Sequence, residues 1–428
     1  MASGDALWLH MERPTSSMAI QVLLWFEEPL DWEQLREVIR ERLVERFPRF
    51  RQRAVPSGRG FRWEAAADFQ LEEHLRRTVL PAPGGRAELE ALAHQGMSTP
   101  LDRARPLWEM QLVEGYGQGS ALLIRMHHSL ADGMTLMRVL LTLMEERPPG
   151  QATSPAHGHE QEAVPRRLRG ARQGDLARWV ATAGRLLVVR SDPPSLIRGP
   201  QGVEKQVVWS DPLPLTVWQR MAHGSGATVN DVFMAVVAGA LGRYLREHGA
   251  PAEEFRANVA VQLRSPSEPL SPELGNELGI WLVELPVRER DPRLRLSEVR
   301  RRMNARKHSL EAVVYRDVMA LTGGTRLTTD LGVRLLASRC SLAVSNMRGP
   351  RHPLFLAGRR MAGAIFWMPM VLGVGLGVTF CSQAGTATLG VTADVGLIPH
   401  PREFLLALYQ EMRELAGVDS LAPSLPGL

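Results

Sequence analysis

A change from a strand pattern to a helix pattern, across one short polar segment, constrains the fold of this chain more than any other feature. Ser120–Met126 is rich in apolar residues that favour strands, whereas Met134–Met144 has apolar residues at helical spacing. The segment between them, His127–Gly133, reads HHSLADG. The pattern predicts a strand, a turn and a helix, with two adjacent histidines where the strand ends.

The histidine pair indicates acyl transfer. A histidine titrates near neutral pH, so it can remove the proton of a hydroxyl whose oxygen attacks a thioester. Neighbouring strand residues point to opposite faces, so we expect His128 to be the general base and His127 to have a structural role in the same site. We expect Asp132 to accept a hydrogen bond or pair with an arginine, and Gly133 to allow a backbone conformation barred to residues with a Cβ.

A metal site and a bystander role are the alternatives for these histidines. Two histidines and an aspartate could bind a metal ion, but adjacent histidines rarely converge on one ion. The sequence has neither an HExxH helix nor clustered cysteines, so we expect no metal. It also has no GxSxG motif to supply a nucleophile, which favours direct transfer without a covalent intermediate.

The HHSLADG segment resembles the HHxxxDG motif of the coenzyme A-dependent acyltransferase superfamily, which includes condensation domains. The whole chain resembles the bacterial wax ester synthase/diacylglycerol acyltransferase family. The matching segments, in order, are Asp5–Glu12, Pro100–Glu109 with its PLW element, Asn230–Asp231, Val261–Arg264, Gly275–Asn276 and Ser345–Pro350. The HHxxxDG motif alone indicates only the superfamily, whereas PLW, ND and SNxxGP together are more specific.

This resemblance implies an α/β fold of two domains, each a mixed sheet with flanking helices, with an active-site channel at their interface. It implies an O-acyltransferase that moves a long-chain acyl group from acyl-coenzyme A, as co-substrate and without a further cofactor, to a fatty alcohol or a diacylglycerol. The product would be a wax ester or a triacylglycerol. The alternatives are a condensation-like acyltransferase that uses a carrier-protein thioester and a noncatalytic lipid-binding protein.

Two single residues are candidates for substrate binding. Arg264 ends a strand-like segment, and because a buried arginine needs an acidic partner we expect it to pair with Asp132. A surface arginine at a strand end is the alternative. Asn276 follows Gly275, and its amide could donate to a developing oxyanion. A turn residue before a strand is the alternative for Asn276.

Five more candidates depend mainly on the resemblance. Asn230 or Asp231 would cap a helix, and the resemblance places this pair near the channel. Ser345 and Asn346 belong to a predicted loop between strands, which the resemblance places near the interdomain cleft. Ser382 precedes a glutamine where family members often have an aromatic residue, and this departure bears on the identity of the substrate.

The length of 428 residues exceeds what one core usually serves, so two domains are expected. We place an N-terminal domain at residues 1–148, a linker at 149–202 and a C-terminal domain at 203–428. The linker is rich in Pro, Gly, Arg and Gln. Its middle, residues 176–189, has helical apolar spacing and could dock on a domain or a bilayer surface.

The net charge is +5, and Lys205 and Lys307 are the only lysines, so arginine supplies almost all of the positive charge. No zinc finger, basic helix or RNP motif supports binding to nucleic acid. Coenzyme A phosphates and anionic membrane surfaces suit the charge better. The densest basic run, residues 300–307, is best explained as a solvated helix face. Cys340 and Cys381 lie in apolar segments, which predicts buried thiols in a reducing compartment, with a disulfide as the alternative.

Residues 361–381 form an uncharged and mostly apolar stretch. Pro369 and four glycines interrupt it, so we expect one or two buried strands with a turn rather than a membrane helix. The N-terminus lacks a basic segment followed by an apolar run, which predicts a cytoplasmic protein. Peripheral association with the inner membrane or with lipid inclusions is compatible with that location.

Overall fold

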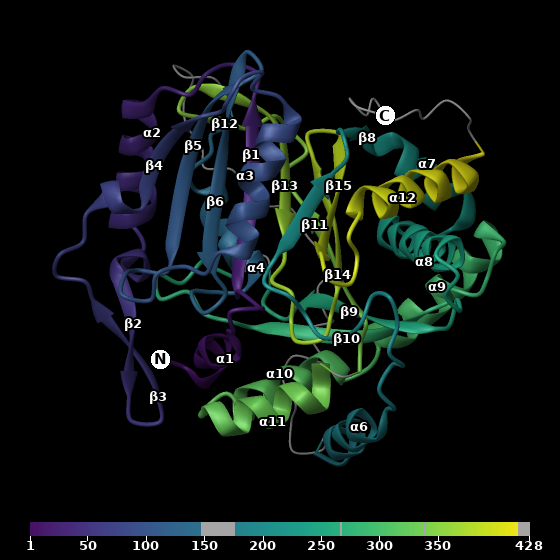
Figure 1. Cartoon of the computed structure of the whole chain (residues 1–428). Coiled ribbons are helices and arrows are strands. Elements are labelled where there is room, and N and C mark those ends of the chain that lie inside the picture. Colours follow the sequence, from purple (N-terminus) through teal and green to yellow (C-terminus); the bar gives the residue numbers. More distant parts are fainter. Residues whose placement is uncertain (147–175, 266–267, 338, 418–428) are drawn as a thin grey trace.

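The computed structural model describes residues 1–146, 176–265, 268–337 and 339–417 (Figure 1). Residues 147–175, which include half of the expected linker, therefore lie outside the described residues. Two mixed sheets dominate the molecule, with helices around them. This arrangement confirms the predicted α/β class.

The first sheet has six strands, in the order β12 (Phe355–Leu356), β13 (Arg359–Trp367), β1 (Ala19–Phe26), β6 (Gly119–His127), β5 (Trp108–Tyr116) and β4 (Leu75–Val79). The second sheet contains, in order, β10 (Leu278–Leu285), β9 (Phe255–Gln262), β11 (Leu342–Arg348), β14 (Leu376–Gln383), β15 (Thr386–Asp394) and β7 (Lys205–Trp209), with β8 (Leu213–Pro214) also paired to β15. A separate hairpin consists of β2 (Gln52–Ser57) and β3 (Gly60–Ala65).

Helices surround both sheets, and in Figure 1 α7, α8, α9 and α12 lie beside the second sheet, while α1, α6, α10 and α11 lie at its lower end. The α-helices are α1 (Ser3–Met11), α2 (Trp32–Ile39), α3 (Arg86–Ser98), α4 (Gly133–Leu141), α6 (Leu176–Val188), α7 (Leu215–Ser225), α8 (Val229–Glu247), α9 (Pro292–Lys307), α10 (Glu311–Thr322), α11 (Arg326–Ala337) and α12 (Pro401–Ala416). Shorter turns are η1 (Arg40–Glu45), η2 (Pro48–Arg51) and η3 (Leu71–Glu73).

Strand β13 belongs to the second half of the sequence but completes the first sheet. It pairs antiparallel with β1, with Gln21 opposite Trp367 and Leu24 opposite Ala364. Thr379 of β14 donates a hydrogen bond to the carbonyl oxygen of Phe366, over 2.8 Å, and so ties this strand to the second sheet. The sheets are thus not divided at residue 203, and the expected domain boundaries remain predictions from the sequence.

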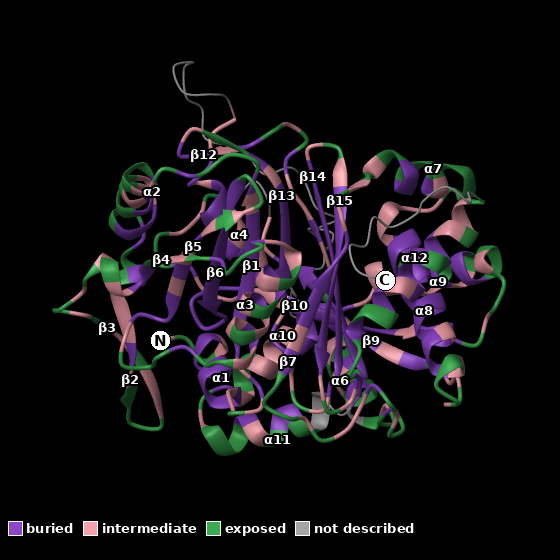
Figure 2. Cartoon of the chain, turned by 45° about the horizontal axis from the view of Figure 1, so that its top comes forward, coloured by how far each residue is buried: buried purple, intermediate pink, exposed green. Residues whose placement is uncertain are grey.

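The strand that precedes the histidines is buried along its whole length, as its apolar sequence leads one to expect. Strand β6 pairs with β1 on one side and β5 on the other, and α4 begins six residues after β6 ends, at Gly133. The predicted order of strand, turn and helix is therefore confirmed. Figure 2 shows the same distribution across the molecule, with buried residues in the strands and exposed residues on the outer helix surfaces.

Helix α8 forms the centre of the second core. Fourteen of its 19 residues are buried, which explains why its sequence is apolar on nearly every side. Among the described helices, none alone has the length and apolar composition to span a bilayer. Helices α7 and α8 satisfy those criteria only as a pair, and they are bent by 96°.

Several local predictions can be compared with the structure. Residues 361–381 contain parts of the two buried strands β13 and β14, as expected. Cys340 and Cys381 are buried free thiols, and burial raises the pKa of each to about 12. The assignment of residues 345–348 to a loop is wrong, because they continue β11 and pair in register with β14.

Candidate active site

The turn after β6 is held by Asp132, which begins helix α4. One carboxylate oxygen accepts a hydrogen bond from the backbone amide of Thr135, over 2.8 Å, as a helix cap. The other accepts from the backbone amide of Glu277, over 2.9 Å. The expected hydrogen-bonding role of Asp132 is confirmed, and it joins the histidine segment to the chain that leads into β10.

Two expectations about this turn are wrong. Arg264 does not pair with Asp132: its guanidinium lies 3.7 Å from Glu277 and 3.9 Å from Glu268, while backbone amides occupy both oxygens of Asp132. Gly133 does not have a positive φ, because it lies in the first turn of α4. A Cβ at Gly133 would lie 3.8 Å from Ile20, which is an ordinary contact. The glycine is therefore not required by the backbone conformation, and its missing side chain only leaves space beside Ile20.

His127 is fully buried in a polar environment behind the strand end. Its Nδ1 accepts a hydrogen bond from the backbone amide of Ser129, over 3.1 Å, and its Nε2 lies 3.4 Å from Oε1 of Glu12. Burial alone would raise the pKa of Glu12, but His127 and Arg103 outweigh it and hold that pKa at about 2. His127 is thus held by an ionised carboxylate.

His128 is also buried, at 6% exposure, but its surroundings are different. Its ring stacks on Trp8, with centroids 3.6 Å apart and an interplanar angle of 17°. Its Nδ1 lies 3.0 Å from Oδ1 of Asn276. Burial lowers the pKa of His128 to about 4, although the charge of Asp132 and the contact with Asn276 act in the opposite direction. The imidazole is therefore neutral at pH 7.

The amide of Asn276 determines which nitrogen of His128 carries the proton. Its Nδ2 donates to Oδ1 of Asp5 and to the backbone carbonyl of His128, both over 2.9 Å. These acceptors fix the orientation of the amide, so its Oδ1 faces the ring and Nδ1 of His128 must donate. The other ring nitrogen, Nε2, keeps a lone pair. A neutral histidine in this form can act as a base.

The expectation that Asn276 donates to an oxyanion is wrong for the same reason. Its Nδ2 has two hydrogens, and Asp5 and the carbonyl of His128 take both. The backbone amide of Asn276 also donates to Asp5, over 3.0 Å. Asn276 therefore positions His128 and has no side-chain donor left for a substrate.

His128 lines a narrow cavity of about 110 Å³ between the two sheets, which we call the apolar cavity. Most of the side chains around it are apolar. They come from helices α1, α4, α10 and α11, from strands of both sheets and from the chain after β13: Trp8, Met11, Ile20, Met134, Tyr315, Met319, Val333, Met347, Phe366 and Met368. Gly133 also lies on this wall, so a larger side chain there would enter the cavity. The predicted residues Ser345 and Asn346 line it as well.

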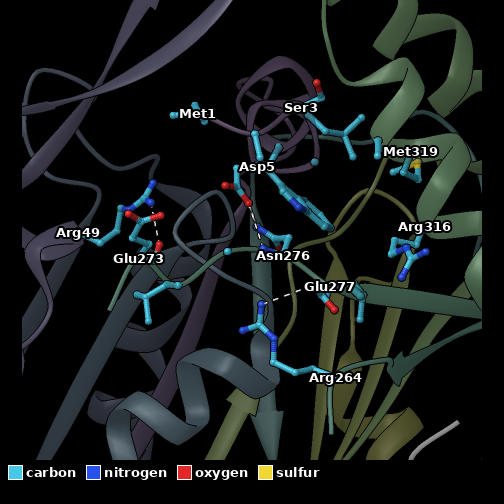
Figure 3. Close-up of a pocket in the computed structure, with 18 of the residues that line it drawn as sticks. Met1, Ser3, Asp5, Arg49, Arg264, Glu273, Asn276, Glu277, Arg316 and Met319 are labelled. Carbon is cyan, nitrogen blue, oxygen red and sulfur yellow. Dashed lines mark hydrogen bonds and ion pairs between the residues drawn. The ribbon is translucent and has the colours of Figure 1, made fainter. Parts of the chain in front are cut away.

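A second cavity of about 950 Å³, which we call the polar cavity, lies on the other side of α1 (Figure 3). Two arginines line it: Arg264 lies 3.7 Å from Glu277, and Arg49 donates to the backbone carbonyl of Glu273 over 2.7 Å. Asp5 points toward Asn276 at its inner end. The two cavities share a wall made of Trp8, Leu278, Ile280, Tyr315 and Met319.

The remaining predicted residues lie at different distances from this centre. Asn230 accepts a hydrogen bond from Asn346 over 3.1 Å, which connects it to the apolar cavity. Asp231 belongs to the capping box of α8, but Thr228 is the capping residue rather than either member of the pair. Ser382 lines neither cavity, and its backbone carbonyl accepts a hydrogen bond from the backbone amide of Gly349.

Sequence reasoning gave no role to the first helix, which supplies a partner to each histidine. Asp5 holds Asn276, Trp8 stacks on His128, and Glu12 contacts His127. Residues spaced by three and four lie on one side of a helix, so the spacing of 5, 8 and 12 was the available signal.

Both halves of the chain resemble known acyltransferases. Residues 1–211 match the family model described as "Wax ester synthase/diacylglycerol acyltransferase catalytic domain", and residues 274–416 match "WS/DGAT C-terminal domain". A relative from Mycobacterium tuberculosis, named "Putative diacyglycerol O-acyltransferase Rv3740c", is 30% identical over 97% of this chain and 99% of its own length.

Solved structures show the same fold. The wax ester synthase/diacylglycerol acyltransferase from Marinobacter aquaeolei VT8 has a TM-score of 0.72 at 24% identity, covering 97% of this chain and 98% of its own. The first condensation domain of the calcium-dependent antibiotic synthetase has a TM-score of 0.63 at 17% identity, covering 98% and 96%.

Proposed function

From the premise that the chain belongs to the wax ester synthase/diacylglycerol acyltransferase family and is an acyltransferase, we propose that it transfers a long-chain acyl group from acyl-coenzyme A to a hydroxyl. The acceptor is a fatty alcohol or a diacylglycerol. His128 is the general base, and no covalent acyl-enzyme forms. The observation that carries this proposal is the hydrogen bond between His128 and Asn276, which leaves Nε2 of His128 as the basic nitrogen.

The reaction follows from that nitrogen. The acceptor hydroxyl donates its proton to Nε2 while its oxygen forms a bond to the thioester carbonyl carbon. The tetrahedral intermediate then collapses, the carbon–sulfur bond breaks, and the leaving thiolate takes the proton from the imidazolium. The charge of Asp132, which favours the protonated ring, stabilises this transient imidazolium. The products are an ester and coenzyme A.

The two cavities suit the two chemical parts of the substrates. The apolar cavity, which His128 lines, is surrounded by side chains that an acyl chain can contact without losing hydrogen bonds. The polar cavity, at about 950 Å³, has the size of a small-molecule site and offers paired charges for the polar part of the thioester donor. Trp8 lies in the wall between them, against the ring of His128.

The test is release of thiol from palmitoyl-coenzyme A by the purified protein, with and without hexadecanol or diolein. We expect release that depends on the acceptor and that falls by roughly 10²- to 10⁴-fold in His128→Gln. The exposed His223 provides a matched control, since His223→Gln should retain full activity. Acceptor-dependent activity that survives in His128→Gln would refute the assignment of the base. Transfer from an acylated carrier protein but from no coenzyme A thioester would refute the donor.

A further inference from the structure

The outer surfaces of α6, α10 and α11 expose an unusual number of large apolar side chains. Eleven such side chains are exposed in the described part of the chain, and six of them are on these three helices. They are Leu176 (66% exposed), Val180 (56%), Val188 (77%), Leu321 (74%), Leu327 (81%) and Leu331 (61%), and we call them the apolar face. Exposed apolar side chains that gather on neighbouring helices indicate an interaction site.

The three helices belong to one part of the molecule. Helix α10 contacts both α11 and α6, and α6 also contacts α11. Figure 1 shows them together at the end of the molecule below the second sheet. The inward side of α6 is packed, with Leu186 in the core and Trp179 donating to Asp317 of α10 over 3.0 Å. The exposed apolar residues of α6, Leu176, Val180 and Val188, are four and eight positions apart, so they lie on its opposite side.

The apolar face is continuous with the substrate cavities. Leu321 is exposed and also lines the polar cavity. Helix α10 contributes Tyr315 and Met319 to the wall that the cavities share, and α11 contributes Val333 to the apolar cavity. The helices that expose leucines outward therefore also form the walls around His128.

Charge indicates which apolar partner fits. Helix α6 contains two arginines and no acidic residue. Arg185, Arg326 and Arg334 are exposed, and among the described residues no carboxylate lies within ion-pair distance of them. The nearby acids are used elsewhere, since Asp330 pairs with Arg13 and Asp317 with Arg316. A surface with exposed leucines and unneutralised arginines is complementary to an anionic lipid surface.

We propose that the apolar face docks the protein on an anionic lipid surface and delivers water-insoluble acceptors from that surface to the cavity of His128. This inference depends on the proposed function for its acceptor. Exposed leucines enter the boundary between head groups and acyl chains, while the arginines contact the lipid phosphates. Because α10 and α11 also line the cavities, a lipid that leaves the surface reaches the reaction site without crossing water.

The first experiment is flotation with vesicles of phosphatidylcholine, with and without phosphatidylglycerol. The double variant Leu327→Ser/Leu331→Ser should bind at least ~10-fold more weakly to both vesicles. Arg326→Gln/Arg334→Gln should bind vesicles that contain phosphatidylglycerol about 30-fold more weakly than the wild type, and should bind pure phosphatidylcholine vesicles as the wild type does. Val79→Ser is the matched control, since Val79 is 68% exposed on the edge strand β4 of the first sheet. It should bind like the wild type.

A second measurement separates docking from catalysis. With a short acyl-coenzyme A and a water-soluble alcohol, the leucine variant should keep wild-type activity, whereas its activity on diolein in vesicles should fall at least ~10-fold. If the wild type has activity neither on the water-soluble alcohol nor on diolein, the proposed function itself is refuted. Equal vesicle binding by the wild type and the leucine variant would refute the docking face. Conversion of a dimer to a monomer by the leucine variant would also refute it, because a second copy would then cover the face.

Discussion

His127 and His128 are neighbours in the chain, but the protein surrounds them with opposite environments. His127 lies against the ionised carboxylate of Glu12, which Arg103 also holds. His128 lies against a neutral amide and the flat face of an indole. One residue of strand alternation therefore decides whether a buried imidazole faces a carboxylate or faces a cavity with a basic nitrogen.

The largest expected difference between the two is in turnover. His128→Gln should lower kcat by roughly 10²- to 10⁴-fold, because the base is lost. His127→Gln should change kcat of the folded protein by less than about 10-fold, because His127 touches no cavity. Steady-state kinetics on both variants, corrected for the folded fraction by circular dichroism, measures this contrast. Equal losses of kcat in the two variants would remove the distinction between them.

The next effect concerns stability on the His127 side. Glu12→Gln removes the charge that faces His127 and Arg103 in a buried site, so the free energy of unfolding should fall by roughly 3 kcal/mol. Urea denaturation measures this loss. The control is Glu33→Gln, which removes a carboxylate from an exposed ion pair with Arg36 and should change stability by less than about 1 kcal/mol. Similar values for the two variants would show that the pair with His127 is not structural.

The dependence of the free energy of unfolding on acidic pH should differ between His128 and Glu12. Burial lowers the pKa of His128 from the 6.5 of an unperturbed histidine to about 4, so folding favours the neutral ring. The resulting stability is complete above pH 6.5 and is lost as pH falls toward 4, by roughly 3 kcal/mol in total. Glu12, with a folded pKa of about 2 against 4.5, loses its contribution only between pH 4.5 and 2.

Urea denaturation at a series of pH values tests these two windows. The difference between the wild type and His128→Gln should develop between pH 6.5 and 4, whereas the difference between the wild type and Glu12→Gln should shrink below pH 4.5. The acid limb of kcat should also lie near pH 4 rather than near 6.5. An acid limb near pH 6.5 would show that the ring of His128 is not desolvated as its burial indicates.

The smallest effect is expected at Asn276. Asn276→Leu removes the acceptor that fixes the proton on Nδ1 of His128, so kcat should fall on the order of 10²-fold with little change in KM. Asn276→Asp keeps an oxygen acceptor toward the ring but places a second carboxylate beside Asp5. It should raise the pKa of the acid limb, which a merely structural role would not move. An unchanged pH profile in Asn276→Asp would contradict the positioning role.

The strand and the helix around the histidines were predictable from local periodicity, and the opposite directions of the two rings were predictable from strand alternation. The fold class was predictable from the family resemblance. The partners of these residues were not. The pairing of Arg264 with Asp132 was inferred from charge alone, but backbone amides of Thr135 and Glu277 satisfy that carboxylate. Periodicity places a residue on one face of a helix or strand. Its hydrogen-bond partners depend on which distant segments of the chain pack against that face.

Asn276 illustrates the same limit at the centre of the site. The sequence indicated that its amide mattered, and proximity to His128 agrees with that prediction. The direction of the amide depends on Asp5, which lies on α1, 271 residues earlier in the chain. The contact with Asp5 decides whether Asn276 presents its NH₂ group or its oxygen to the site, so the sequence around Asn276 could not distinguish a donor from an acceptor.

The late arrival of strand β13 has a consequence for how the molecule is made. Strand β1 is synthesised long before β13, so its edge opposite β6 stays unpaired until Trp367 has been synthesised. Pairing between such distant segments is slow, and an open apolar strand edge is prone to join another chain. The first half should therefore need protection during translation, and an isolated fragment that stops before Phe355 should aggregate rather than fold.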